Sequence, residues 1–513
     1  MKNYLALLLA VFLVLGFAAS AFAIHAEIPA ETTAVVSPGG TQITIGGEVR
    51  VRGDFEQSTA DFNSSIADHP HYYDERVRLS VDAKVTPNTE AMIQLESTNE
   101  NTASASADLN IWGNYNAGGS VTSNFPVGTP ALPANAAPVP GATHATGLYQ
   151  AGNAQHDALS ILQAWILHSG TGLFGVPAGV KVGHMPLALG NGLFFDHTHF
   201  GDDAVLFFVD PVQDLHIVTL DAKFRQGASP YSNNNNADAY VFLMNYAPKD
   251  WSASFDATYV NDQNSFGVAY VNPSLAENSV PILPNATFPL HFWNFGLRGN
   301  GTFSGFTFKV DGELQAGSVK NAAPAFNGFT AAGDADFKGW AILASGSYKL
   351  DPVTLTLEGA YGSGLKKNSG NVDDFVTSLG ADQHFTYVYD YRTVNACGMQ
   401  YGGLCNTWYV KLGGQADLTK DVTSYINLFY LGAVEDAQIT LPVSELMTKG
   451  TSKDIGFEID AKVNYKIDRN LQYWVEGGYL FAGGFFDTAA TATQPAHSAD
   501  GAWGIRHGIQ LNF

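Results

Sequence analysis

Charged side chains occupy every second position in two segments near the start of the chain. They alternate with apolar residues between Gln42 and Phe55, and again between Tyr72 and Val85. Guanidinium groups at this spacing share one face of a strand, where they could attract anions through charge-assisted hydrogen bonds. They could equally form salt bridges with carboxylates on the same face. The charged positions are Glu48, Arg50, Arg52, Asp54, Arg76, Arg78 and Lys84.

The opposite face of these segments is apolar. Val77, Leu79 and Val81 separate the charges of the second segment, which is the two-residue period of a β-strand. The same alternation returns at 306–315 and at 455–467. In a water-soluble sandwich the apolar face would meet a second sheet. In a membrane barrel it meets lipid, and the charges face a wet lumen.

The composition decides between these two folds. Only 14% of the 513 residues are Asp, Glu, Lys or Arg, against roughly 25% in soluble proteins. Beyond the N-terminal segment, no apolar run approaches the ~18 residues that a spanning helix needs. The net charge of −22 argues against binding to nucleic acid phosphates. A charge-poor chain that is 12% aromatic and lacks spanning helices favours a transmembrane β-barrel.

The connections between the expected strands alternate in length. Short ones at 86–89, 351–352 and 468–470 are separated by long ones such as 100–157 and 363–405. Short periplasmic turns and long outer loops are typical of outer-membrane barrels. We therefore predict an all-β fold, a closed antiparallel barrel of about 18 strands without exposed edges. The loop at 100–157 could fold into the pore as a constriction or remain a solvated surface loop.

The two ends of the chain carry processing signals. Residues 1–23 have the charged start, apolar core and small-residue cleavage site of a secretory signal peptide. We expect a periplasmic segment at 24–40 and the barrel at 41–513.

The terminal Phe513, on the apolar face of the last strand, resembles the signature that the barrel assembly machinery reads. We expect a monomer, because trimeric general porins usually form smaller barrels.

Two further groups of residues have chemical potential. Cys397 and Cys405 are the only cysteines, and in an oxidising compartment we expect them to form a loop disulfide. The stretches FFDHTHFGDD at 194–203 and DHPHYYD at 68–74 combine imidazoles with carboxylates, which can bind divalent cations. No fixed metal motif fits them, and polar loops collect such residues, so we expect no metal and no cofactor. The absence of CxxCH excludes a c-type haem of the chain's own.

Several stretches are similar to the alginate-export family of outer-membrane porins. They are YYDERVRLSVDAKVTPNTEAMIQLES at 72–97, VKVGHMPLALGNGLFFDHTHFGDDAVLFFVDP at 180–211, FTYVYDYR at 385–392 and DIGFEIDAKVNYKIDRNLQYWVEGGYLFAGG at 454–484. The resemblance implies a pore of about 18 strands in a Gram-negative outer membrane. The best-known member's arginine-lined pore passes anionic polysaccharide. His184 stands where that pattern has an arginine, so the resemblance supports the fold more than the solute.

The alternation then assigns a pore-lining set with basic and acidic members. Strands from opposite ends of the chain should meet when the barrel closes, bringing a basic wall and an acidic wall together. Such walls create a transverse field that orients polar solutes. The set is Arg50, Arg52, Arg76, Arg78, Lys84, Arg298, Lys309, Glu48, Asp54, Glu458, Asp460 and Glu476.

These features favour an outer-membrane channel for passive diffusion of small polar or anionic solutes, with carbohydrate or polysaccharide among the candidates. The alternative is a structural barrel that sheathes a partner such as a multihaem electron carrier. We expect no enzymatic activity, because GxSxG, HExxH, P-loop and nicotinamide-binding glycine patterns are all absent. The expected contacts are outer-membrane lipid and small solutes, and not nucleic acid.

Overall fold

The computed structural model describes most of the barrel and its inner loops. The described residues are 34–36, 40–66, 69–98, 110–111, 158–172, 175–226, 236–265, 288–322, 333–364, 366, 369, 371–379, 383–400, 402–441, 446–491 and 494–513. The predicted signal peptide and nearly all of the loop at 100–157 lie outside these residues. No helix in these ranges is long and apolar enough to cross a membrane.

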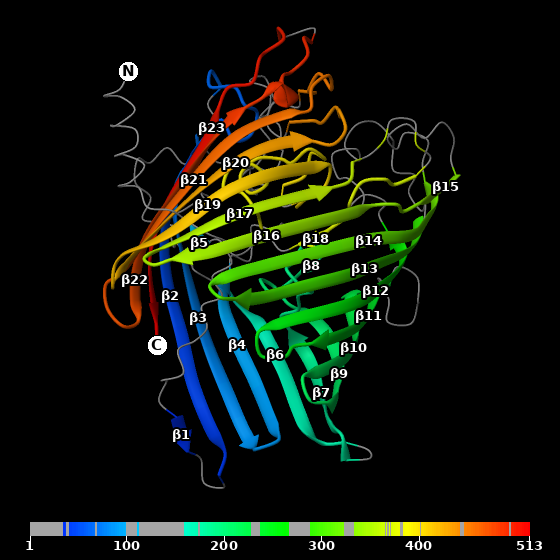
Figure 1. Cartoon of the computed structure of the whole chain (residues 1–513), viewed down its shortest axis with the longest axis vertical. Helices are drawn as coiled ribbons and strands as arrows, with labels where there is room; N and C mark the ends of the chain where they lie inside the picture. The colour runs from blue at the N-terminus through cyan, green and yellow to red at the C-terminus, as the bar shows by residue number, and fades with distance from the viewer. Residues whose placement is uncertain are drawn as a thin grey trace, which may run out of the picture.

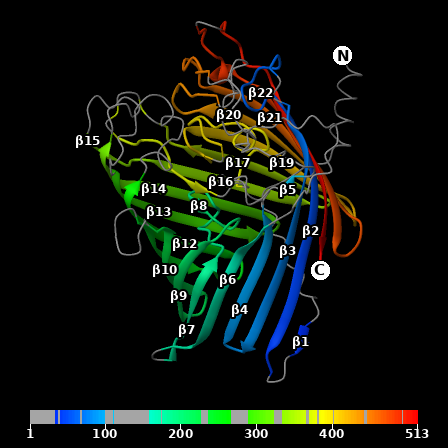
Figure 2. The same cartoon turned by 180° about the vertical axis from the view of Figure 1, so that it is seen from behind.

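Eighteen long strands in the described residues form one closed antiparallel barrel (Figures 1 and 2). The last strand pairs with the first along its length, from Glu48 opposite Asn512 to Gln57 opposite Trp503. The predicted fold class is confirmed. The strands are β2 (Gln42–Gln57), β3 (His71–Thr86), β4 (Thr89–Thr98), β6 (Ala158–Thr171), β7 (Pro177–Met185), β9 (Asp202–Val212), β10 (Leu215–Arg225), β11 (Ala237–Tyr246), β12 (Trp251–Ser265), β13 (Phe288–Phe303), β14 (Phe306–Ala322), β16 (Trp340–Leu350), β17 (Val353–Gly362), β19 (Thr407–Thr419), β20 (Val422–Ala433), β21 (Asp454–Lys466), β22 (Leu471–Ala482) and β23 (Ala502–Asn512).

Short elements supplement this wall. Three of them extend it or pair along it, and a 3-10 helix follows β22. Two others, β8 and β18, pair with each other in parallel and belong to a separate small sheet. These elements are β1 (Ala34–Val36), β5 (Asn110–Ile111), β15 (Gly333–Asp336), η3 (Gly484–Phe486), β8 (Phe195–Asp196) and β18 (Ser378–Leu379).

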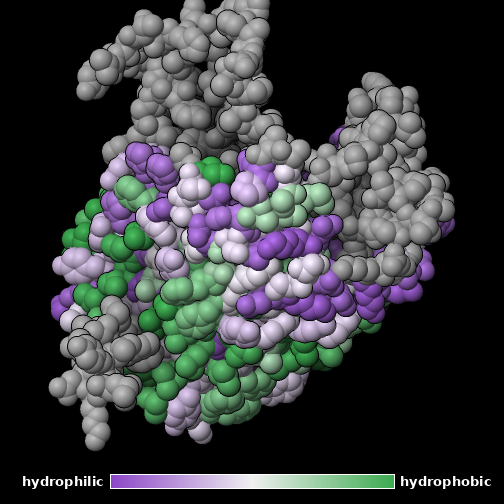
Figure 3. Space-filling model, turned by 90° about the horizontal axis from the view of Figure 1, so that it is seen from above, coloured by the Kyte–Doolittle hydropathy of each residue, from purple (hydrophilic) through white to green (hydrophobic). Residues whose placement is uncertain are grey.

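The two faces of the wall follow the alternation in the sequence. Val49, Val77 and Leu79 are 39–43% exposed, whereas Arg50 and Arg76 on the other face are 8% and 6% exposed. Apolar side chains gather in patches on the outer wall (Figure 3). Charge on the lipid face of a barrel is costly, so alternate positions stay apolar. The low charge content of the chain therefore has a direct structural cause.

Two long connections pack inside the barrel. They are the β7–β9 loop (residues 186–201), which contains β8, and the β17–β19 loop (residues 363–406), which contains β18. The side chains of Tyr387 and Tyr389 in the second loop are at most 1% exposed. The sequence grouped 363–405 with the polar outer loops, and that interpretation was wrong. Aromatic and apolar residues in this loop form a core with the inner face of the wall.

Candidate pore site

The four arginines of β2 and β3 lie together, each close to a carboxylate-bearing strand position. Register places Arg50 opposite Arg76 and Arg52 opposite Asp74. Arg52 Nε donates to Asp74 at 3.0 Å, and Arg76 Nη2 lies 2.6 Å from Glu48. This region therefore consists of ion pairs and does not form a continuous positive surface. Arg78 pairs with Glu96 on β4. Lys84, near the turn to β4, is exposed and faces Glu90 across the two strands.

Arg298 on β13 is the centre of a buried charge cluster. Its Nε donates to Asp311 Oδ2 at 3.1 Å, and its terminal nitrogens pair with Asp256 and Glu313. All four side chains are at most 1% exposed. Asn191 of the β7–β9 loop donates its backbone and side-chain N–H groups to Asp311 Oδ2, both at 3.1 Å. The cluster therefore fixes this loop to the wall.

Gly190 of the β7–β9 loop packs against this cluster, and Lys309 of β14 lies nearby on the wall. Gly190 has φ +57°, and a Cβ built there would meet the Arg298 guanidinium at 1.6 Å, so no larger residue fits without movement. Lys309 lies opposite Asn300 and is only partly buried. The alternation in the sequence predicted that Arg298 and Lys309 both lie on the inner face. Among the residues that the structure describes, Arg298 contacts an inner loop and Lys309 does not.

Glu458 and Asp460 on β21 hold the β17–β19 loop through its backbone. Glu458 accepts hydrogen bonds from the amides of Tyr387, Val388 and Tyr389 at 2.6–2.9 Å. Asp460 accepts from Tyr387 N at 3.1 Å. Both carboxylates are at most 1% exposed. Three consecutive amides converging on one carboxylate form an anion-binding nest, which the wall itself fills. Neither residue therefore faces open solvent.

Arg392 in the β17–β19 loop is a site residue that the alternation did not identify. Its Nη1 lies 2.8 Å from Asp54 on β2, and it pairs with Glu56 as well. Its guanidinium lies over the ring of Tyr387, 4.5 Å from the centroid. Burial by itself would lower the Arg392 pKa, but the charges of Asp54 and Glu56 outweigh it and hold the pKa well above its usual range. The two-residue alternation identifies inward-facing residues only in strands, and Arg392 lies in a loop. The signal in the sequence that points to it is the FTYVYDYR stretch at 385–392, which ends with this arginine.

Asp54 joins this loop to the closing strand of the barrel. Arg506 on β23 also reaches Asp54, at 2.7 Å, and donates to the Tyr391 hydroxyl at 2.7 Å. Glu476 on β22 pairs with Lys462 at 2.8 Å and lies 3.9 Å from Arg506. The closing seam thus carries a paired network, but its ion pairs are Arg506–Asp54 and Lys462–Glu476, and the arginines of β2 and β3 pair within their own part of the wall.

The β17–β19 loop crosses the lumen. Its Arg392 reaches β2 at the closing seam, while Val376 N donates to Gln315 Oε1 on β14 at 2.9 Å. Strands β2 and β14 lie on nearly opposite sides of the barrel in strand order. Gln315 Nε2 also donates to Val376 O at 2.6 Å, so the far end of the loop is held by two bonds. The wall and this loop together narrow the interior.

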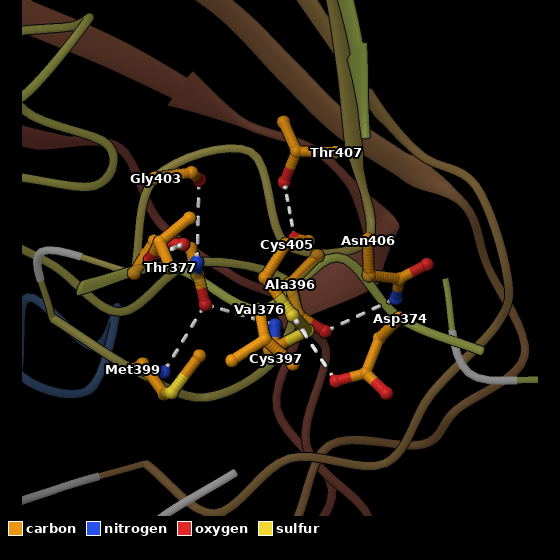
Figure 4. Close-up of a disulfide and its surroundings, with 12 residues drawn as sticks. Asp374, Val376, Thr377, Ala396, Cys397, Met399, Gly403, Cys405, Asn406 and Thr407 are labelled. Carbon is orange, nitrogen blue, oxygen red and sulfur yellow. Dashed lines mark hydrogen bonds between the residues drawn. A yellow bond between two sulfur atoms is a disulfide. The ribbon is translucent and has the colours of Figure 1, made fainter. Parts of the chain in front are cut away.

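A disulfide joins Cys397 and Cys405 within the same loop (Figure 4). The Asp374 carboxylate points toward it, with Oδ2 3.5 Å from Cys405 Sγ. Asp374 is 2% exposed. Burial, with a smaller contribution from the Asp373 charge, raises the pKa of Asp374 to about 7. Asp390 is also buried, and its pKa is raised in the same direction.

These shifts predict that the β17–β19 loop packs less stably as pH rises. The released loop would ionise Asp374 near its ordinary pKa of 3.8, whereas the packed loop holds its proton until about pH 7. Packing is therefore fully stable at acidic pH, and stability falls between these two values. Limited proteolysis of the loop at pH 4–8 would measure this. D374N should reduce the slope, and a slope unchanged by D374N would contradict the assignment.

Among the residues that the structure describes, the histidine clusters considered from the sequence form no candidate group of metal ligands. In the ranges that the structure describes, the candidate ligand group is Asp374 with Cys397 and Cys405, and both thiols are engaged in the disulfide. His197 bonds to Asp202, and His184 bonds to Asp203. His184 Nε2 also lies 2.8 Å from Phe200 O. These histidines organise the β7–β9 loop.

Comparison with known proteins agrees with the fold. Residues 285–500, from just before β13 to just before β23, match the family model described as alginate export. Curated proteins give no match. Among solved structures, Pseudomonas aeruginosa OccK5 (OpdH) is 11% identical with a TM-score of 0.48, covering 91% of this chain and 98% of its own. P. aeruginosa OpdK with vanillate is 10% identical, with a TM-score of 0.47 and coverage of 91% and 98%.

An anion-selective porin from Comamonas acidovorans is 11% identical, with a TM-score of 0.41 and coverage of 92% and 100%. The family match confirms the resemblance predicted from the sequence over residues 285–500, which include the stretches at 385–392 and 454–484. The alternating wall, the closed barrel and the family match all indicate a β-barrel of the Gram-negative outer membrane. The chain is a closed β-barrel of the outer membrane, and its residues 285–500 match the model of the alginate export family.

Proposed function

We propose that the chain is a constricted diffusion channel for small polar or anionic solutes in the Gram-negative outer membrane. The predicted pore-lining residues divide into two roles under this proposal. Arg50, Arg52, Arg76 and Arg78, with their carboxylate partners, act as the charged lining. Arg298, Glu458 and Asp460 instead anchor the two inner loops. Carbohydrates and acidic saccharides are the solutes to test first.

One observation carries this proposal. The β7–β9 and β17–β19 loops fold inward and bind charged wall residues through Asn191 and Arg392. An inward loop reduces the cross-section of a barrel that would otherwise be wide. Paired charges along the remaining wall leave a polar surface that a hydrated solute can follow. Transport of this kind requires no catalytic step, which is consistent with the channel character of the matched family.

The sheath alternative lacks a supporting observation. A barrel that encloses a folded electron carrier needs a wide interior, and among the described residues two of the chain's own loops occupy it. We propose a monomer that contacts lipid through its apolar wall. We also propose assembly through the terminal strand, where Phe513 N donates to Gly47 O at 3.0 Å and so completes the closing seam.

Neutralising the charged lining should change ion selectivity. Replacing Arg50, Arg52, Arg76 and Arg78 by glutamine leaves Glu48, Asp74 and Glu96 unpaired, so the lining becomes negative. We expect the anion-to-cation permeability ratio in planar bilayers to fall several-fold. A matched control replaces four exposed lysines by glutamine: Lys320, Lys349, Lys420 and Lys453.

Competition measurements extend the same experiment. Sugars, organic acids and acidic saccharides are added to one side of the bilayer. Each should reduce the ion current through the pore, and the solutes that enter the pore most readily should reduce it most. Equal selectivity in the arginine variant and the lysine control would contradict the proposed lining. A preparation that inserts but never conducts would contradict the channel itself.

A further inference from the structure

Ser378, His197 and Asp202 form a hydrogen-bonded chain between the two inner loops. His197 Nε2 lies 2.7 Å from Ser378 Oγ, and His197 Nδ1 lies 2.9–3.0 Å from both carboxylate oxygens of Asp202. We propose that Ser378 is an activated nucleophile that attacks carboxylic esters, with His197 as its general base. A nucleophile bonded to a base, and a base oriented by a third group, is the arrangement that such chemistry requires. The proposal is independent of the channel function.

The local fold places these three side chains by specific bonds. Gly201 has φ +73°, and its amide donates to His197 O at 2.7 Å, so the chain turns back and brings Asp202 under the imidazole. Ser378 arrives from the other loop through the parallel pairing of β18 with β8. There Ser378 N donates to Phe194 O at 2.7 Å, and Ser378 lies opposite Phe195. The serine is thereby fixed close to the imidazole.

The imidazole has little freedom to turn away. Its ring centroid lies 4.1 Å from that of Phe195, 4.5 Å from that of Phe200 and 5.5 Å from that of Phe224. His197 and Asp202 are 6% and 7% exposed, whereas Ser378 is only partly buried. The base and its orienting carboxylate are therefore shielded from water, and the nucleophile is more accessible than either of them. Preorganisation of this kind is what a nucleophilic site needs.

An apolar pocket adjoins the serine and indicates the class of substrate. Ser378, Thr377 and Thr258 line it, and its other lining residues are apolar or aromatic, including Phe194, Phe224, Leu290 and Phe292. No charged side chain lines it. The pocket is small, so it accepts little more than a methyl group, and its apolar wall disfavours a charged one. The site fits esters with an apolar acyl group better than acidic saccharides.

The reaction balances with water as the only co-substrate. Ser378 Oγ forms a bond to the ester carbonyl carbon while its proton passes to His197 Nε2. The carbon–oxygen bond to the alcohol then breaks, and the proton passes from Nε2 to the leaving oxygen. Water repeats the sequence on the acyl-serine, which releases the carboxylic acid and restores Ser378. Asp202 stabilises the imidazolium formed in each half and acts as a positioning residue.

Labelling with a fluorophosphonate probe tests the proposal on the full-length folded barrel in detergent. Wild type should be labelled, and the labelled peptide should contain Ser378. S378A should abolish labelling, and H197A should slow it by about 10²–10⁴-fold, the usual contribution of a general base. D202N should slow labelling and D202E should partly restore it, which a merely structural bond would not produce. S347A, a serine on β16 hydrogen-bonded to Thr356, is the matched control.

Hydrolysis of 4-nitrophenyl esters of increasing acyl length provides the second measurement. Acetate should be cleaved faster than butyrate, because the apolar pocket has room for little more than the acetyl methyl group. Retained heat-modifiable gel mobility shows that each variant is folded. Folded wild type that is not labelled, or labelling that persists in S378A, would overturn the proposal and leave the His197–Ser378 bond as a tie between loops. Single-channel conductance of the same preparations reports separately on the channel.

Discussion

Replacing Arg298 by methionine is expected to destabilise the barrel by about 3–5 kcal/mol, because the change leaves three buried carboxylates without their cation. Asp256, Asp311 and Glu313 all converge on this guanidinium, and none of the four side chains is more than 1% exposed. Methionine fills most of the volume, so the loss reports on charge and not on a cavity. Equilibrium unfolding in guanidinium, followed by tryptophan fluorescence in detergent, would measure the change.

Two further variants show whether this loss of stability comes from the buried charge of Arg298. R298K keeps the charge but cannot reach three carboxylates with planar geometry, so it should restore only part of the stability. K320M breaks a pair with Asp334 whose side chains are about half exposed, and it should cost less than ~1 kcal/mol. If R298M and K320M lowered stability equally, Arg298 would not be the organising centre of the cluster.

The β7–β9 loop should respond to R298M as well. Asn191 binds Asp311, and Gly190 packs directly against the guanidinium, so loss of the cation loosens the loop at both points. Faster proteolysis between 186 and 201 is therefore expected in R298M and not in K320M.

Much of the fold could be predicted because strands have a strict period. Alternation at Arg50, Val51 and Arg52 determines which side chain meets lipid, and the structure places the arginines on the buried face. Short turns mark where the chain reverses. The number of strands then follows from counting segments, and closure follows from the cost of an unpaired edge.

The inner loops could not be predicted in the same way. Residues 363–406 have no period, and their aromatic residues are equally compatible with a surface loop and with a core. Glu458 meets the amides of residues some 70 positions away, at Val388 for example. Such contacts depend on the whole barrel being closed. Spacing along the sequence therefore identified Glu458 as inward-facing without identifying what it binds.

The arginine cluster illustrates the same limit. The sequence left an anion-attracting patch and a set of salt bridges equally open. Arg52–Asp74 and Arg76–Glu48 show that the carboxylates are within bonding distance. Pairing reduces the net field of the cluster but leaves guanidinium groups on the inner face. Only the selectivity of the neutralised variant can separate attraction of anions from structural pairing.

Excising most of the β17–β19 loop should raise single-channel conductance several-fold, because the loop crosses the lumen. Its ends already meet, since Asn406 N donates to Ser363 O at 3.1 Å, so residues 366–403 can be replaced by a short glycine linker. Tyr361 and Trp408 should remain paired across β17 and β19. Removal of 115–150 from the other long loop is the matched control, and we expect it to change conductance less.

A milder variant protects the experiment against a folding failure. E458Q with R392Q keeps the loop but weakens its two charged anchors to the wall near the closing seam, Glu458 on β21 and Asp54 on β2. The carboxamide at position 458 still accepts one amide but no longer offers a charge to the nest. We expect more frequent transitions to a high-conductance state.

The most direct measurement is the single-channel conductance of wild type and of the 366–403 excision, recorded in the same planar bilayers. We predict a small conductance for wild type and a conductance several-fold larger for the excised barrel, with the E458Q/R392Q variant switching between the two levels. Equal conductance in wild type and the excised barrel, with both shown to be folded, would contradict the conclusion that the inner loops constrict the channel.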